Sequence, residues 1–182
     1  MIRYEVWAES EENKMKKKSC MILFVTILLV LSLTGCGKNY EKQLLPEDAN
    51  LSEAPDVKVD EEEEIHCLTN WTEESVVFWD IKIPKDGDYV IEIDYSRPGN
   101  YPEANGRLWL QADEGEPVML DFVAKPTTDE TDNWKKYKKM SMETKLTEGE
   151  YEVILLPDYA AVGDMPEKFI NLRSVTIKEK EK

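Results

Sequence analysis

Apolar and polar residues alternate along most of the chain after residue 65, in short segments separated by turns. The first segment places its apolar side chains at every second position: Val77, Trp79, Ile81 and Ile83. A period of two is that of a β-strand with one buried face. The pattern recurs in later segments: 89–95, 107–111, 118–122, 134–142, 151–156 and 169–178. No helical apolar stripe longer than a turn or two interrupts them, which predicts an all-β antiparallel sandwich over 65–182.

The connections between these predicted strands alternate between short and long. The short ones are 84–88, 113–116 and 147–150, and the long ones are 96–105, 124–133 and 157–168. Alternate connections of an antiparallel sandwich emerge at opposite ends, so we expect the long loops to cluster at one end. Their aromatic and polar side chains suit a sugar, which offers apolar C–H patches and hydroxyls. The candidates are Arg97, Tyr101 and Tyr159, with Trp134 at the start of the next strand. The alternative for both tyrosines is that they only pin their loops.

The N-terminal region carries a different signal. An uncharged apolar run follows Lys16, Lys17 and Lys18 and ends in Leu33-Thr34-Gly35-Cys36. Such a run is shorter than the ~20 apolar residues of a spanning helix and has the length of a signal peptide. Its end resembles the lipobox of bacterial lipoproteins, which implies a diacylglyceryl group on the Cys36 thiol and cleavage before that residue. An ordinary N-terminal membrane helix is the alternative.

These signals divide the chain into four parts. Residues 1–14 fit no part of a signal peptide and form an upstream extension, with translation expected to start at Met15. Residues 15–35 are the lipoprotein signal peptide, 36–64 an acidic linker and 65–182 the sandwich. The linker holds Pro46, Pro55 and an acidic run at 60–64, which predicts a disordered tether spanning roughly 30 Å. The predicted location is extracytoplasmic, lipid-anchored to the outer surface of the cytoplasmic membrane or to an outer membrane.

Charge and residue counts narrow the choice of partners. The net charge of −15 opposes binding to nucleic acid and to anionic headgroups, so the partner is expected to be neutral or cationic. With Cys20 removed and Cys36 lipidated, Cys67 is left alone and no intramolecular disulfide can form. His66 is the only histidine, which excludes metal sites built on several histidines. We therefore predict no enzymatic activity and no cofactor.

Several short motifs occur in a fixed order after residue 65: Asn70-Trp71, 78–84, 86–91, 133–137, 148–153 and 171–177. Together they resemble the galactose-binding-like jelly roll of carbohydrate-binding module families 6 and 35, and of related sandwich domains appended to glycosidases and sulfatases. The resemblance implies that Trp134 stacks on a sugar, that Tyr101 forms the opposite wall and that Asn171 supplies a polar contact. Related modules often hold a structural calcium ion, so calcium is compatible with the resemblance, but no acidic segment has ion-loop spacing and no ligands are assigned.

Two functions of different class follow. One is a glycan-binding or polysaccharide-binding module, with Trp134 and Tyr101 facing each other across a groove. The other is an envelope interaction or structural module that docks a protein partner through an apolar patch. For the remaining aromatic residues we expect Trp79 and Tyr137 in the core, Trp71 as a plug at the sandwich edge and Trp109 covered by a neighbouring segment.

Overall fold

The computed structural model describes residues 39–60, 66–72, 74–113, 115–158 and 169–181. The upstream extension, the signal peptide, Cys36 and Tyr159 lie outside these residues. No helix in the described part of the chain is long and apolar enough to cross a membrane.

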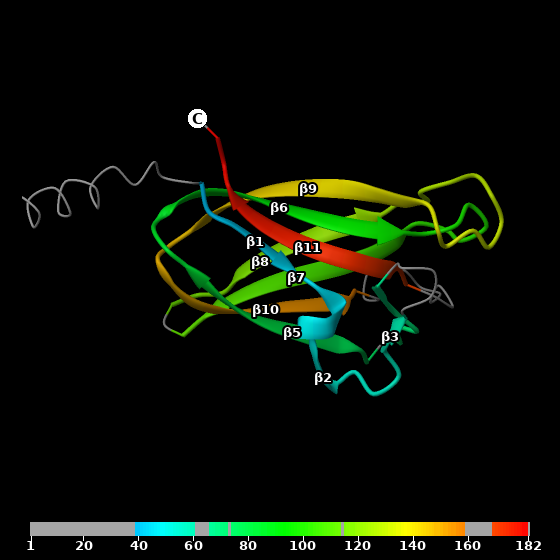
Figure 1. Cartoon of the computed structure of the whole chain (residues 1–182), viewed down its shortest axis with the longest axis horizontal. Coiled ribbons are helices and arrows are strands. Elements are labelled where there is room, and N and C mark those ends of the chain that lie inside the picture. The colour runs from blue at the N-terminus through cyan, green and yellow to red at the C-terminus, as the bar shows by residue number, and fades with distance from the viewer. Residues whose placement is uncertain (1–38, 61–65, 73, 114, 159–168, 182) are drawn as a thin grey trace, which may run out of the picture. The chain divides into compact units, whose positions relative to one another are not determined.

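Two antiparallel sheets pack face to face and enclose a single core (Figure 1). Among the described residues, one sheet has the order β3-β4-β11-β6-β9 with β1 also paired to β11, and the other has the order β2-β5-β10-β7-β8. Their bounds are β1 Glu41–Leu44, β2 Asn50–Glu53, β3 Lys58–Asp60, β4 Cys67–Thr69, β5 Val76–Ile83, β6 Gly87–Ser96, β7 Ala104–Ala112, β8 Val118–Ala124, β9 Tyr137–Leu146, β10 Gly149–Pro157 and β11 Asn171–Glu179, with a 3-10 turn η1 at Pro46–Asp48. The predicted all-β antiparallel sandwich is confirmed.

The alternation read from the sequence sets which side chains fill the core. On β5 and β6 the predicted inward residues are all buried: Val77, Trp79, Ile81, Ile83, Tyr89, Ile91, Ile93 and Tyr95. The charged residues between them stand on the outer faces, as a pleated strand requires. Burial of apolar surface contributes about 25 cal/mol per Å², so this double layer of large side chains stabilises the fold.

The segment 39–60 belongs to the sandwich, which corrects its assignment to a disordered linker. β1 pairs with β11, β2 with β5 and β3 with β4. Leu44, Ala54 and Val57 are buried in the core. The indole N–H of Trp79 donates a hydrogen bond to the carbonyl of Leu45 at 3.0 Å. The sequence hides these strands because each has only three or four residues and exposes its charged side chains, so its order depends on partner strands far along the chain.

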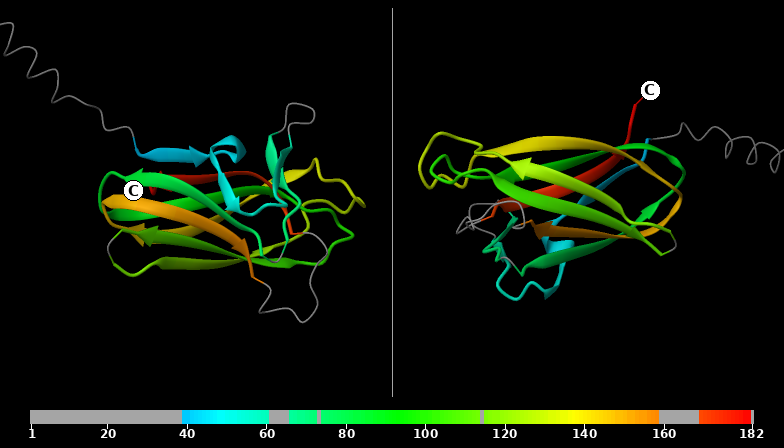
Figure 2. Two further views of the ribbon diagram at one scale, coloured as in Figure 1. Left: turned by 90° about the horizontal axis from the view of Figure 1, so that it is seen from below. Right: turned by 180° about the vertical axis from the view of Figure 1, so that it is seen from behind.

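The first two long loops lie side by side at one end of the sandwich, as predicted (Figure 2). The backbone N–H of Gly99 donates to the carbonyl of Glu130 at 3.1 Å, and that of Thr127 to the carbonyl of Arg97 at 2.7 Å. A Cβ atom on Gly99 would lie 2.7 Å from the carbonyl oxygen of Thr128, so only glycine permits this approach. The third long loop is mostly outside the described residues, but its end, Phe169, lies against the same region.

Candidate functional site

Ser96, at the end of β6, organises the long-loop end of the sandwich. It is fully buried and pairs with Asn171 on β11 and with Tyr137 on β9. Its hydroxyl donates a hydrogen bond of 2.5 Å to the carbonyl of Trp134. One residue therefore fixes the backbone positions of Trp134 and Asn171, which are 37 positions apart in the sequence.

A pocket of about 420 Å³ lies at this end. Eight residues line it: Asp60, Thr69, Asn70, Trp71, Trp134, Phe169, Ile170 and Asn171. Indole surface stands beside amide, hydroxyl and carboxylate groups, which is the mixture that binding sites for small polar rings present. Two residues predicted from the sequence, Trp134 and Asn171, are thus brought to one cavity.

Tyr101 does not form the opposite wall of a groove. Its ring centroid lies 5.3 Å from that of Trp134, at 49° between the planes. A sugar stacked between two aromatic rings needs them roughly 7 to 8 Å apart, twice an ordinary contact distance. The phenol of Tyr101 also donates to the carboxylate of Asp132 at 3.3 Å. Tyr101 therefore packs against Trp134 and holds its loop, which is the alternative that the sequence left open.

Arg97 is not a surface ligand of a sugar, because its side chain is fully buried. Its Nε donates to the carbonyl of Pro102 at 2.6 Å, and its Nη1 donates to the carbonyl of Phe169. Its guanidinium carbon lies 5.6 Å from the ring centroid of Tyr101. Arg97 thus ties its own loop to the segment entering β11, and its predicted role in binding is corrected to a structural one.

The floor of the pocket comes from Trp71, which is buried as predicted. Its indole N–H donates to the carbonyl of Leu68 at 3.3 Å, and its ring meets that of Phe169 edge-on, with centroids 5.6 Å apart. The preceding residue, Asn70, has a φ of 60°, a left-handed conformation that asparagine tolerates better than most residues. This turn follows β4 and places Asn70 at the pocket.

No pattern in the sequence indicated that Asp60 and Thr69 contribute to the pocket. Both come from the hairpin of β3 and β4, and Asp60 lay in the segment taken for a linker. Asn70 had one indication, because Asn70-Trp71 is among the motifs shared with the carbohydrate-binding modules. The convergence of Asp60, Thr69 and Asn70 with Asn171 on one pocket depends on the pairing of β4 with β11, at Leu68 and Leu172.

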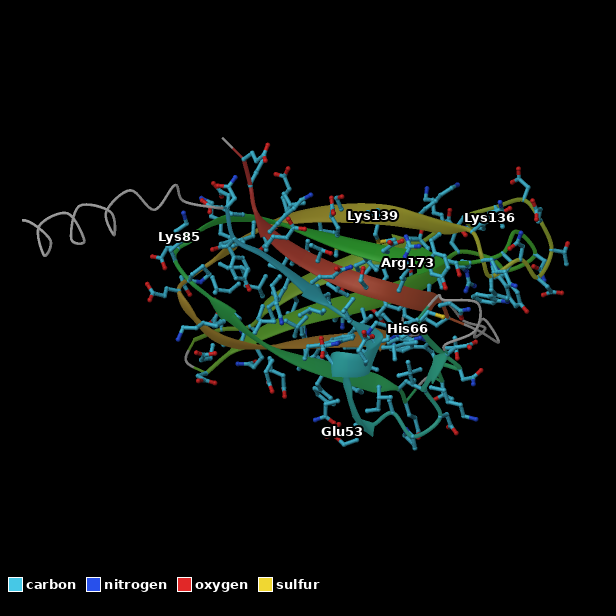
Figure 3. All side chains as sticks on the ribbon, in the orientation of Figure 1. Glu53, His66, Lys85, Lys136, Lys139 and Arg173 are labelled. Atoms are coloured by element: carbon cyan, nitrogen blue, oxygen red, sulfur yellow. The ribbon has the colours of Figure 1, made fainter. Side chains whose placement is uncertain are left out.

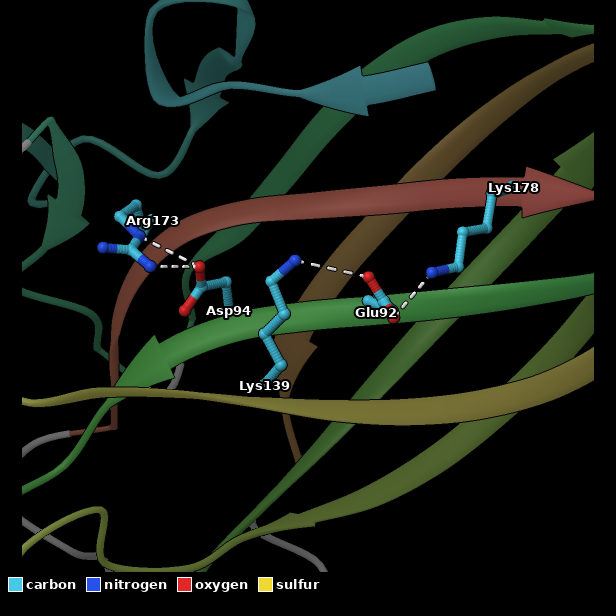
Figure 4. A network of polar contacts seen from close by, with 5 residues as sticks. All are labelled: Glu92, Asp94, Lys139, Arg173 and Lys178. Carbon is cyan, nitrogen blue, oxygen red and sulfur yellow. Dashed lines mark hydrogen bonds and ion pairs between the residues drawn. The ribbon is translucent and has the colours of Figure 1, made fainter. Parts of the chain in front are cut away.

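The outer face of the six-stranded sheet carries a network of ion pairs between side chains of β6, β9 and β11 (Figures 3 and 4). Arg173 donates two hydrogen bonds, at 2.9 and 2.6 Å, to one carboxylate oxygen of Asp94. Glu92 accepts from Lys178 at 2.8 Å and from Lys139 at 3.4 Å. The hydrogen bond from Lys178 is the main reason that the pKa of Glu92 lies below its usual value. These carboxylates are engaged with cations of the same sheet, so this face is a structural charge network.

Tyr137 lies on the same face, half-buried and not in the core as predicted. The guanidinium carbon of Arg173 stands 4.7 Å from its ring centroid. Burial, and then a hydrogen bond with Cys67, raise the pKa of the Tyr137 phenol well above its usual range. Burial also raises the pKa of the Cys67 thiol. Both groups therefore stay neutral at physiological pH, and neither is an activated nucleophile.

Trp109 lies on the outer face of the other sheet, where it is half-buried. It stands in a row of apolar residues that are paired directly across the strands: Phe78, Ile154, Trp109 and Met119. Met119 is 57% exposed and Val123, on the same strand, is 43% exposed. The indole of Trp109 has Ile154 on one side and Met119 on the other, and packing against these cross-strand neighbours accounts for its partial burial.

Metal binding has no visible site in the described residues. Within those ranges, no group of three or more histidine, cysteine, aspartate or glutamate side chains is placed to hold a metal ion.

Comparison with known proteins identifies the fold. No protein-family model matches the chain, and no curated protein sequence matches it. Among solved structures, a family 35 carbohydrate-binding module from Clostridium thermocellum aligns with a TM-score of 0.56 and 14% identity, over 76% of this chain and 97% of that one. A family 6 module of lichenase 5A from Cellvibrio mixtus, in complex with cellotriose, aligns with a TM-score of 0.55 and 14% identity, over 77% and 98%.

A family 35 module from Paenibacillus barcinonensis gives a TM-score of 0.55 and 12% identity, over 79% of this chain and 100% of that one. Identities this low show the fold alone. The alignments span nearly the whole length of each module and most of the described part of this chain. The chain therefore has the galactose-binding-like β-sandwich fold of carbohydrate-binding module families 6 and 35.

Proposed function

We propose that the sandwich is a non-catalytic glycan-binding module of a lipid-anchored extracytoplasmic protein, and that the glycan binds in the pocket at the long-loop end. The observation that carries this proposal is the convergence of Trp134 and Asn171 on one pocket of about 420 Å³. A sugar ring can stack on the indole of Trp134 while the amide of Asn171 exchanges hydrogen bonds with its hydroxyls. The fold shared with carbohydrate-binding modules supports this assignment.

The glycan is expected to be neutral or cationic. The net charge of the protein is −15, and Asp60 is the one charged residue among those that line the pocket in the described part of the chain. A polyanionic polysaccharide would approach against this field. Nucleic acid is excluded as a partner for the same reason.

The decisive test is Trp134→Ala, assayed by calorimetry with an oligosaccharide found on a glycan array. Loss of the stacking indole should lower affinity about 5- to 150-fold, which corresponds to about 1 to 3 kcal/mol, the range known for nucleobases that stack on aromatic side chains. The matched control is Trp109→Ala, which removes a half-buried tryptophan from the outer face of the other sheet. It should leave affinity unchanged. Loss of affinity in Trp109→Ala alone would place the site on that sheet face and contradict the proposal.

Asn171→Ala tests the polar contact separately. Sugar hydroxyls left without a partner should cost about 1 to 3 kcal/mol of binding free energy. The backbone of Asn171 stays paired with Ser96, so the circular dichroism spectrum and melting temperature should be close to those of the wild type. An unchanged dissociation constant would remove Asn171 from the site.

Anchoring is a separate part of the proposal and rests on the lipobox ending at Cys36. Cys36→Ser should abolish incorporation of a fatty-acid analogue in metabolic labelling and release the protein from the membrane fraction. Cys67→Ser is the matched control, because it removes the buried cysteine of the sandwich and should leave labelling intact. Labelling that persists in Cys36→Ser would contradict lipidation at this residue.

A second candidate function is docking of an envelope protein on the outer face of the five-stranded sheet. The exposed side chains of Met119 and Val123 favour it, since large apolar residues on a surface mark interaction sites when they are contiguous with others. Met119→Asp would weaken such docking and spare glycan binding, whereas Trp134→Ala would do the reverse. Co-purification from membrane extracts after cross-linking, compared between these two variants, separates the two functions.

A further inference from the structure

The described chain enters the sandwich at the end opposite the pocket. β1 runs antiparallel to β11, with Glu41 paired to Lys178 and Leu44 paired to Val175. Asn171, at the other end of β11, lines the pocket. Asn171 and Lys178 are seven residue steps apart on β11, which is about 23 Å of strand at 3.3 Å per step. Figure 1 shows β1 starting beside the C-terminal end of β11, whereas the pocket is lined by the first residue of β11.

The entering chain is fixed from Tyr40 onward. The carbonyl of Tyr40 accepts a hydrogen bond of 2.8 Å from the backbone N–H of Glu179. Its ring packs edge-on against Tyr89, with centroids 6.0 Å apart, and burial raises the pKa of its phenol. Leu44 follows in the core with 1% exposure. Tyr40 is therefore part of the folded body and not of a flexible tether.

Covalent geometry then limits the distance to the expected lipid. Four Cα-to-Cα steps separate Cys36 from Tyr40, and at 3.8 Å each they span about 15 Å at most. That reach is shorter than the length of β11 between its two ends. A lipid on Cys36 would hold the Tyr40 end close to the bilayer, and the roughly 30 Å tether expected from the sequence does not exist.

The outer face of the five-stranded sheet disfavours a module that lies flat on that face. Asp80 on β5 and Glu152 on β10 stand directly opposite each other there, and both are exposed. Anionic headgroups repel these carboxylates.

We propose that the anchored module stands on the membrane with its pocket directed outward, so that it captures a glycan located beyond the bilayer surface and not the sugar headgroup of a membrane lipid. This inference rests on the lipidation at Cys36 in the proposed function. The pocket rim would lie roughly 20 to 40 Å from the lipid, the sum of the strand length and the short covalent link.

The test uses two dye positions on the full lipidated protein in vesicles whose headgroups carry an energy acceptor. Lys85→Cys labels the Tyr40 end and Lys136→Cys labels the pocket end, and both side chains are exposed at opposite ends of the sandwich (Figure 3). Cys67 is buried, so a thiol dye reaches only the introduced cysteine under native conditions. Energy transfer should be at least twofold higher from position 85 than from position 136. Equal or reversed transfer would overturn the upright orientation.

A spacer variant tests the short link itself. Twenty Gly/Ser residues inserted between Lys38 and Asn39 have an end-to-end distance of roughly 25 Å, so transfer from position 85 should fall more than twofold. Unchanged transfer would show that the link does not hold this end near the lipid. If the unmodified protein fails to bind vesicles at all, lipidation and orientation are both refuted, while calorimetry of the pocket still decides glycan binding.

Discussion

At the scale of single residues, burial separates residues that are equally good candidates for sugar binding by sequence alone. Arg97 and Trp134 are both chemically suited to a sugar and both come from long loops. Arg97 is fully buried and donates to the carbonyls of Pro102 and Phe169, whereas Trp134 lines the pocket. Accessibility to a ligand is a property of the packed structure, so residue type and loop position could not separate the two.

Arg97→Met should therefore destabilise the fold. The substitution keeps an unbranched apolar stem but leaves the carbonyls of Pro102 and Phe169 without their donor, at about 1 to 3 kcal/mol for each lost partner. Denaturant unfolding should show a loss of roughly 2 to 5 kcal/mol. The control is Lys82→Met, because Lys82 and its partner Glu150 are both exposed, so that pair contributes at most about 1 kcal/mol. If Arg97→Met is as stable as the wild type but binds the glycan more weakly, Arg97 is a sugar-binding residue and this prediction is wrong.

At the scale of elements, the short strands of 39–60 move the expected N-terminal boundary of the folded domain from residue 65 to residue 39. β2 pairs with β5, and Leu44, Ala54 and Val57 complete the core. β3 also supplies Asp60 to the pocket. A protein that begins at residue 65 would lack these strands, expose core surface and leave the indole N–H of Trp79 without the Leu45 carbonyl.

We expect residues 39–182 to fold and residues 65–182 to be unfolded or partly folded. Within the full chain, Leu44→Ala should cost about 2 to 5 kcal/mol, the usual range for truncating a buried leucine. Glu41→Ala is the control, because its side chain on the same strand is exposed. Thermal unfolding followed by circular dichroism provides the measurement. Equal melting temperatures for 39–182 and 65–182 would contradict the assignment of these strands to the core.

The ion pairs on the outer face of the six-stranded sheet predict a specific acid sensitivity. Hydrogen bonding by Lys178 lowers the pKa of Glu92 in the folded state. A lowered folded-state pKa gives stability that is present above the unfolded-state pKa and is lost as pH falls through the folded-state value. The melting temperature of Glu92→Gln should therefore fall less than that of the wild type between pH 6 and pH 2. Glu116→Gln, in the turn between β7 and β8, should follow the wild type. Identical acid profiles for all three proteins would exclude this contribution.

At the scale of the whole molecule, the two ends of the sandwich differ in the length of their connections. The short turns and the start of β1 gather at one end, and the first two long loops with the pocket gather at the other. The strict alternation of short and long connections produces this polarity in any antiparallel sandwich. A single antiparallel pair, β1 with β11, then decides where an anchor upstream of β1 would attach relative to the pocket.

The sequence by itself determined the all-β sandwich, the inward positions of β5 and β6 and the clustering of the first two long loops. Each depends on local information, namely a period of two along a strand and the length of a connection. It also indicated Trp134 and Asn171, because their motifs resemble those of carbohydrate-binding modules. The fold followed from these patterns since every long strand carries enough apolar residues to reveal its buried face.

Only the tertiary structure decided the rest, because it depends on contacts between distant residues. Ser96 brings Trp134 and Asn171 to one pocket, and Asp60 reaches it through the pairing of β3 with β4. Tyr101 packs against Trp134 instead of facing it. Strands of three or four residues carry too few apolar positions to show a period, so the segment 39–60 becomes recognisable only when its partners on β4, β5 and β11 are in place.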